Sequence, residues 1–205
     1  MPKLGCIKLS DKTKQNIFYA APMIVVGSLF TPIYVVQGIY AKYYGLGLTT
    51  IASVILFVRL FDAITDPIIG YLSDKSRIKR GTRKPTMIFG AIVLVSSGYF
   101  LYSPPDDVST LYFVFWFTVF YLGLTLFKIP HLAWGGEISH STHEKTQTYT
   151  IRTVATYSGG LLFYGIPLLP IWETTDITPE TLEFSAIVSG LLMLPLLYLC
   201  IKRVP

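Results

Sequence analysis

Three ionisable residues recur at helical spacing inside one apolar stretch of the chain. Arg59, Asp62 and Asp66 fall on a single stripe at about 100° per residue, and Gly70 continues it. The surrounding run, 46–72, is long enough to cross a bilayer. Charged side chains are costly when they face lipid, so this stripe must face protein or an aqueous cavity. It could be a structural ion pair between helices. A second carboxylate exceeds what one such pair needs, which favours the wall of a transport pathway.

The composition is that of a membrane protein. Of 205 residues, 52% are hydrophobic and 14% are charged, whereas soluble domains carry about a quarter charged residues. The formal net charge of +5 could indicate nucleic-acid binding, but the basic residues flank apolar runs, as in positive-inside topology. Cys6 and Cys200 form no disulfide framework or metal-binding spacing, and no nucleophile–base pair accompanies the spans. We therefore expect no nucleic-acid partner, no cofactor, no metal site and no enzyme activity.

The apolar runs predict an all-α integral membrane domain of six helices, residues 17–201. We place the spans near 17–40, 46–72, 86–103, 110–134, 147–170 and 183–201. A polar arm, 1–16, precedes them and a short tail, 202–205, follows. Proline and glycine occur within these runs, which neighbouring helices tolerate in a membrane.

Charged residues divide the connections between spans into two groups. The basic group comprises the connection between the second and third spans and the C-terminal tail: Lys75, Arg77, Lys79, Arg80, Arg83, Lys84, Lys202 and Arg203. The connections near 104–109 and 171–182 are acidic instead. Because Lys and Arg are retained on the cytoplasmic side, both termini are predicted to be cytoplasmic in a multi-pass protein of the cell membrane.

Two sequence blocks resemble a known family. The first is R-x-x-D-x-x-x-D-P-x-x-G-x-x-x-D from Arg59 onward, followed by a basic loop that ends G-T-R-K-P at residue 85. The second is K-I-P-H from Lys128, followed by G-E-I at 136–138 and then Arg152. Together they are similar to the glycoside–pentoside–hexuronide:cation symporters, the melibiose-permease-like branch of the major facilitator superfamily.

The resemblance implies a six-helix N-terminal half of a twelve-span transporter, built from two three-helix repeats. It implies a cation site at Asp62 and Asp66 and a solute contact from Arg152. The superfamily's cytoplasmic latch corresponds to Gly70, Asp74, Gly81 and Arg83. The implied partners are a small solute such as a sugar or glycoside, a proton or monovalent cation, membrane lipids, and a C-terminal half or a second copy. The alternative is a truncated or non-transporting six-span protein that acts as an interaction partner.

Two positions depart from the family pattern. Val26 occupies the place of a sugar-binding aspartate in the first span, and Lys128 stands where many relatives have asparagine or aspartate. At about 1.5 Å rise per residue, Lys128 lies at the depth of Asp62 and Asp66 within the boundary error. It could extend toward the cytoplasm, but pairing with the carboxylates is the better solution. With Arg59 the set is then neutral, which predicts proton coupling, exchange or facilitated diffusion in place of sodium coupling, with Lys128 also near the solute.

Two residues near the cytoplasmic end of the fourth span allow further interpretations. His131 could relay protons because the ordinary pKa of histidine is near neutrality. It could equally be a solvated side chain beside the loop. Trp134 is predicted to lie at the membrane interface.

Overall fold

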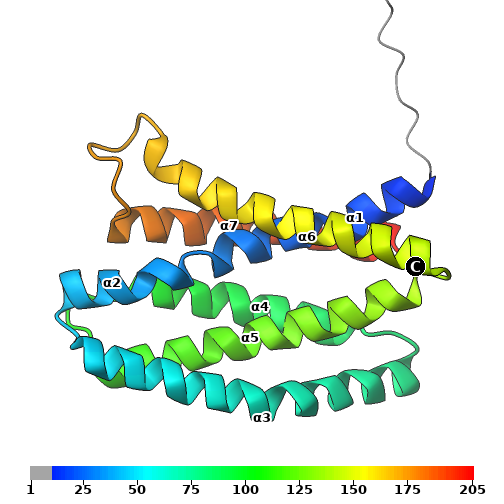
Figure 1. Cartoon of the computed structure of the whole chain (residues 1–205), viewed down its shortest axis with the longest axis horizontal. Helices are drawn as coiled ribbons and strands as arrows, with labels where there is room; N and C mark the ends of the chain where they lie inside the picture. The colour runs from blue at the N-terminus through cyan, green and yellow to red at the C-terminus, as the bar shows by residue number, and fades with distance from the viewer. Residues whose placement is uncertain (1–10) are drawn as a thin grey trace, which may run out of the picture.

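The computed structural model describes residues 11–205, and every regular element in that range is helical. The elements are α1 (Asp11–Phe30), α2 (Ile33–Tyr44), α3 (Leu48–Arg80), α4 (Lys84–Tyr102), α5 (Thr110–Glu137), α6 (Thr142–Gly165), the short 3-10 helix η1 (Ile166–Leu168) and α7 (Pro179–Arg203). The helices run roughly along one common axis (Figure 1). The expected all-α class is confirmed.

Five segments of the described chain are long and apolar enough to cross a membrane: 11–44, α3, α4, α5 and α7. The first segment comprises α1 and α2. Helix α6 occupies the place of the expected fifth span, but its N-terminal half is rich in polar residues and it is not among the five. Membrane crossing by α6 therefore stays a prediction.

The first span differs from its expected outline at both its start and its middle. Helix α1 begins at Asp11, so residues 11–16 of the expected polar arm are helical and Asn16 is buried. Residues 1–10 lie outside the described part. The helix breaks at Thr31 and Pro32, because proline has no N–H to donate to the preceding turn. The Thr31 hydroxyl donates to the carbonyl oxygen of Gly27 at 2.8 Å beside this break.

Helix α3 extends well past the expected end of the second span. Most of the basic connection is its last two turns, which end at Gly81. Gly81 has a φ of +70°, and its N–H donates to Arg77 O at 2.8 Å. Glycine suits this left-handed helix end because it has no Cβ.

The extensive helix contacts all join the first three spans to the last three. Helix α4 packs on α5 and α7, α1 packs on α6 and α7, and α3 packs on α5. Exchanging α1 with α5, α3 with α6, and α4 with α7 reproduces the same set of pairs. This symmetry is that of two interlocked three-helix repeats, as the resemblance implies.

Glycines permit the close approach of α1 to α6. A Cβ added to Gly27 would clash with the backbone carbonyl of Thr156, and one added to Gly159 would clash with the carbonyl of Ile24. Lipid tails are as apolar as the helix surfaces, so the hydrophobic effect does not drive helices together inside a membrane. Membrane helices associate instead through close backbone packing of this kind.

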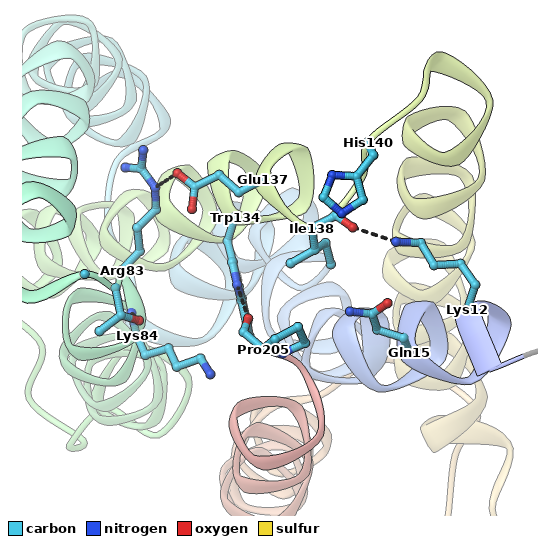
Figure 2. A pocket seen from close by; sticks show the side chains of 11 residues that line it. Lys12, Gln15, Arg83, Lys84, Trp134, Glu137, Ile138, His140 and Pro205 are labelled. Atoms are coloured by element: carbon cyan, nitrogen blue, oxygen red, sulfur yellow. Dashed lines mark hydrogen bonds and ion pairs between the residues drawn. The ribbon is translucent and has the colours of Figure 1, made fainter.

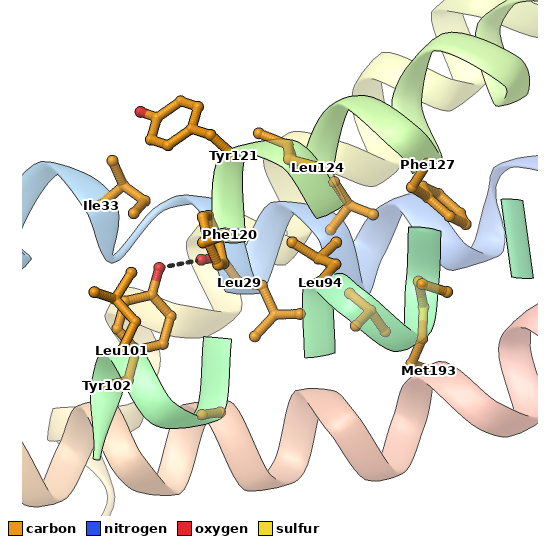
Figure 3. Packing of buried hydrophobic residues seen from close by; sticks show 14 of the residues in the cluster. Leu29, Ile33, Leu94, Leu101, Tyr102, Phe120, Tyr121, Leu124, Phe127 and Met193 are labelled. Atoms are coloured by element: carbon orange, nitrogen blue, oxygen red, sulfur yellow. Dashed lines mark hydrogen bonds between the residues drawn. The ribbon is translucent and has the colours of Figure 1, made fainter. Parts of the chain in front are cut away.

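Aromatic and aliphatic side chains of α1, α4, α5 and α7 form the core between the repeats (Figure 3). Phe120 and Phe127 of α5 are fully buried, as is Leu94 of α4. The buried Tyr102 hydroxyl donates to Leu29 O at 2.6 Å, close to the break in the first span (Figure 3). This bond satisfies a backbone acceptor in a region with no water to do so.

Candidate functional site

A cavity of about 210 Å³ contains the charged residues singled out in the sequence. Its walls are Arg59, Asp62 and Asp66 of α3, Phe30 of α1, and Tyr121, Leu124, Thr125, Lys128 and Ile129 of α5. The helical stripe on α3 therefore faces α5 across a small polar cavity. The structure brings all four predicted coupling residues together.

The Asp62 carboxylate is only partly satisfied within this cavity. Asp62 is half-buried, and its Oδ1 is buried without a hydrogen-bond partner in the described chain. Asp66, one turn further along α3, is exposed. A buried acceptor without a partner is costly. The oxygen of Asp62 is thus placed to accept a proton or a cation.

The two cations of the cavity contact aromatic rings. Lys128 Nζ lies 5.3 Å from the ring centroid of Phe30, and the guanidinium carbon of Arg59 lies 4.8 Å from that of Tyr121. Within residues 11–205, no ion pair of 4.0 Å or less joins either cation to Asp62 or Asp66. The direct Lys128–carboxylate pairing expected from depth is not formed in this structure. The four charges share a cavity without closing on one another.

Arg152 lies outside the lining of this cavity and is held by His131. Its Nε donates to His131 Nδ1 at 3.2 Å, and His131 Nε2 lies 3.0 Å from Tyr19 O. The Tyr19 hydroxyl donates in turn to His131 O at 2.7 Å. His131 is fully buried, so the expectation of a solvated loop histidine is wrong. Sequence inspection missed Tyr19, because nothing local marks an α1 tyrosine as a partner of α5.

Trp134 is also buried, with 5% of its surface exposed. Its indole N–H donates to Pro205 O at 2.9 Å, and Lys84 Nζ lies 5.1 Å from its ring centroid. Trp134 therefore packs inside the bundle beside the C-terminal residue, and the expected position at the membrane interface is wrong.

Arg83 is the centre of the predicted latch. Its side chain is 8% exposed, and Nη1 lies 2.6 Å from Asp74 Oδ1. Its Nε lies 3.1 Å from Glu137 Oε1, as Figure 2 shows. Arg77 pairs with the same Glu137 oxygen. The latch thus ties the end of α3 and the start of α4 to the end of α5. Glu137 belongs to a motif block but was not predicted as a latch residue, and Gly70 faces open space.

The basic connections meet at one end of the bundle. The start of α1, the turn between α3 and α4, the turn between α5 and α6, and the end of α7 all lie there (Figure 1). A second cavity, of about 410 Å³, is found at this end, lined by residues that include Lys12, Arg83 and Lys84 (Figure 2). The basic connections that the sequence separates from the acidic ones are thus also gathered at one end of the folded chain. The cytoplasmic assignment of this end remains a prediction.

A multi-pass bundle of interlocked three-helix repeats, with a charged cavity between α1, α3 and α5, has the architecture of one half of a major facilitator protein. Agreement with a family profile makes the assignment specific. The chain belongs to the MFS/sugar transport protein family, whose profile matches residues 16–204. This membership agrees with the expectation of a transporter rather than an enzyme.

Individual relatives are symporters by name. The chain is 29% identical over 126 residues to "Inner membrane symporter YicJ" of Escherichia coli (strain K12), covering 60% of this chain and 27% of YicJ. It is 26% identical over 172 residues to "Uncharacterized symporter YnaJ" of Bacillus subtilis (strain 168), covering 80% and 36%. It is 32% identical over 116 residues to "Sodium-dependent lysophosphatidylcholine symporter 1" of Gallus gallus, covering 54% and 22%. The chain therefore matches only about a fifth to a third of each relative's length.

Proposed function

We propose that this chain acts as the N-terminal six-helix half of a secondary transporter that moves a small solute in symport with a cation. The observation that carries the proposal is the unpaired buried oxygen of Asp62, in a cavity shared with Asp66, Lys128 and Arg59. A purely structural charge cluster would be expected to close into ion pairs and leave no orphaned acceptor. The same observation disfavours a non-transporting interaction partner.

In this proposal Asp62 and Asp66 bind the coupling cation, and Arg152 contacts the solute. The symporter names of the relatives support cation coupling, and the family description supports a sugar as solute. One relative is named for lysophosphatidylcholine, so a lipid-like solute is the second candidate. Alternating access needs a second six-helix body against which this one rocks. A C-terminal half or a second copy of the chain would supply it, with both termini in the cytoplasm.

Lys128 favours the proton as the coupling ion. Two carboxylates and two cations line the cavity, so the set is neutral before any ion enters. A sodium ion and a proton each add one positive charge to this set, but sodium would have to compete with the Lys128 ammonium for the two carboxylates, whereas a proton binds a single oxygen. Protonation of Asp62 would also remove the negative charge from the carboxylate whose buried oxygen lacks a partner.

The test is solute uptake by proteoliposomes that contain the chain with a complementary six-helix half, and the chain alone in parallel. The panel should contain a neutral disaccharide, a glucuronide and a lysophospholipid. We expect Asp62→Asn and Asp66→Asn each to abolish uphill uptake while membrane insertion persists, because neutral side chains insert more easily. Asp106→Asn, in the exposed connection after α4, is the matched control. Wild-type uptake in both cavity variants would contradict the proposal.

A further inference from the structure

The buried His131 of α5 makes one polar contact with α1 and one with α6 through its ring nitrogens. His131 Nδ1 faces the Nε of Arg152, and its Nε2 faces the backbone oxygen of Tyr19. Its ring stacks on Tyr19 at 4.2 Å between centroids, and on Phe127 at 5.5 Å. Two stacked rings and the contacts of both nitrogens hold the imidazole in one orientation.

These contacts select one protonation state of His131. Arginine is always charged and donates only, so Nδ1 must be the unprotonated acceptor. A backbone carbonyl accepts only, so Nε2 must carry the proton. The neutral ring with hydrogen on Nε2 is the only form that satisfies both. Protonating Nδ1 would set two donors against each other beside a permanent positive charge.

We propose that His131 is a positioning residue that holds the guanidinium of Arg152 through Nδ1 and thereby sets how Arg152 meets the solute. The proposal rests on the assignment of Arg152 to solute contact made above. Arg152 is half-buried and extends from α6, and His131 lies three residues after Lys128 on the same face of α5. His131 therefore links the solute-contacting arginine to the helix that lines the charged cavity. The same geometry argues against a proton relay through this histidine.

Substitutions of His131 can separate its acceptor for Arg152 at Nδ1 from its donor to Tyr19 at Nε2. The side-chain oxygen of asparagine can occupy the place of Nδ1, whereas the amide nitrogen of glutamine can occupy that of Nε2. His131→Asn should thus keep the acceptor for Arg152, while His131→Gln keeps the donor to Tyr19 and loses that acceptor. His131→Phe keeps the ring stacking and loses both.

The first readout is the rate at which phenylglyoxal modifies Arg152 in the full chain in lipid nanodiscs, measured by mass spectrometry. We expect His131→Asn to react as the wild type does. His131→Gln and His131→Phe should react about tenfold faster, the change expected when one hydrogen bond to a charged group is lost. The rate at Arg203 should not change. General loosening of the bundle would instead raise the rate in all three variants alike and overturn the proposal, as would unchanged rates in all of them.

The second readout is nitrogen NMR of the wild-type chain labelled at histidine and arginine. From roughly pH 5 to pH 8, the range in which an ordinary histidine titrates, His131 should remain the neutral form protonated at Nε2, with scalar coupling between His131 Nδ1 and Arg152 Nε. A ring protonated at Nδ1 would overturn the proposal. Neither readout depends on transport, so failure of the proposed function and failure of this inference are distinguishable.

Discussion

Arg83 Nη1 lies 2.6 Å from Asp74 Oδ1, across the turn that reverses the chain from α3 into α4. The same nitrogen donates to Ser73 Oγ at 2.9 Å, while Nε reaches Glu137 on α5. A planar guanidinium can serve these acceptors together, and a single ammonium cannot.

We therefore expect Arg83→Lys to weaken the latch although the charge is kept. The loss of one or two charge-assisted hydrogen bonds should lower the free energy of unfolding by about 1–2 kcal/mol. Thermal unfolding of the chain in detergent micelles measures this. Arg80→Lys is the control, because Arg80 is exposed on the last turn of the same helix. Equal melting temperatures for both variants would show that one contact of Arg83 is enough.

Gly27→Ala should disrupt the packing of α1 on α6. The new methyl group would clash with backbone of Thr156, which cannot move aside as a flexible side chain could. Overpacking typically costs about 1–3 kcal/mol, and a clash with backbone belongs at the upper end. Gly38→Ala is the matched control, since a Cβ there meets nothing within 4 Å. Unfolding temperature and yield of folded protein should fall for the first variant and hold or rise for the second.

Lys128→Asn should change which ion the cavity accepts. The substitution removes one positive charge from a set of two carboxylates and two cations, leaving room for a monovalent metal ion. Uptake by this variant should gain sodium dependence, or sodium binding should become measurable by calorimetry. Saturable stimulation of the wild-type protein by sodium would show that Lys128 does not exclude the ion.

Glu144 should fasten the start of α6 in a pH-dependent way. The pKa of this carboxyl is lowered chiefly by the backbone N–H of His140, and also by Lys12, whose Nζ lies 3.2 Å away. A lowered pKa in the folded state means that the stabilisation is present above the ordinary glutamate pKa of about 4.3 and is lost as pH falls through the folded value.

The difference in unfolding temperature between wild type and Glu144→Gln should accordingly be constant at neutral pH and vanish in acid. Glu173→Gln, in the exposed connection before α7, is the control for removing a carboxylate elsewhere on the surface. If the difference in unfolding temperature for Glu144→Gln persisted at low pH, the shape of the side chain and not its charge would account for the stabilisation.

The cavity was predictable because its members follow simple periodicity. Arg59, Asp62 and Asp66 share a stripe by helical geometry alone, and counting residues from the expected span entries brought Lys128 to their depth. The network of Tyr19, His131 and Arg152 was not predictable in this way. Its members come from three helices, Tyr19 and His131 are 112 positions apart in the sequence, and no local pattern shows which helix faces meet. The absence of a direct Lys128–Asp62 ion pair was not predictable either, because the Lys128 ammonium lies beside the Phe30 ring of another helix.

Element boundaries failed for identifiable reasons. The charged residues 73–80 suggested a loop, yet Lys and Arg are good helix formers and α3 continues until Gly81 ends it. In the first span, an unbroken apolar run concealed the effect of Pro32 on the backbone. Hydropathy indicates where a chain crosses a bilayer but not at which residue a helix begins, breaks or ends.

The interlocked contacts impose an order on assembly. Helix α1 finds its main partners only in α6 and α7, which leave the ribosome after α3, α4 and α5. Until then the face of α1 that carries Gly27 must remain in lipid or be shielded by the insertion machinery, because the first three spans make no extensive contacts among themselves. Biogenesis should therefore be a late, concerted event. A helix substitution far along the chain would leave the first span without its partners and expose it to quality control.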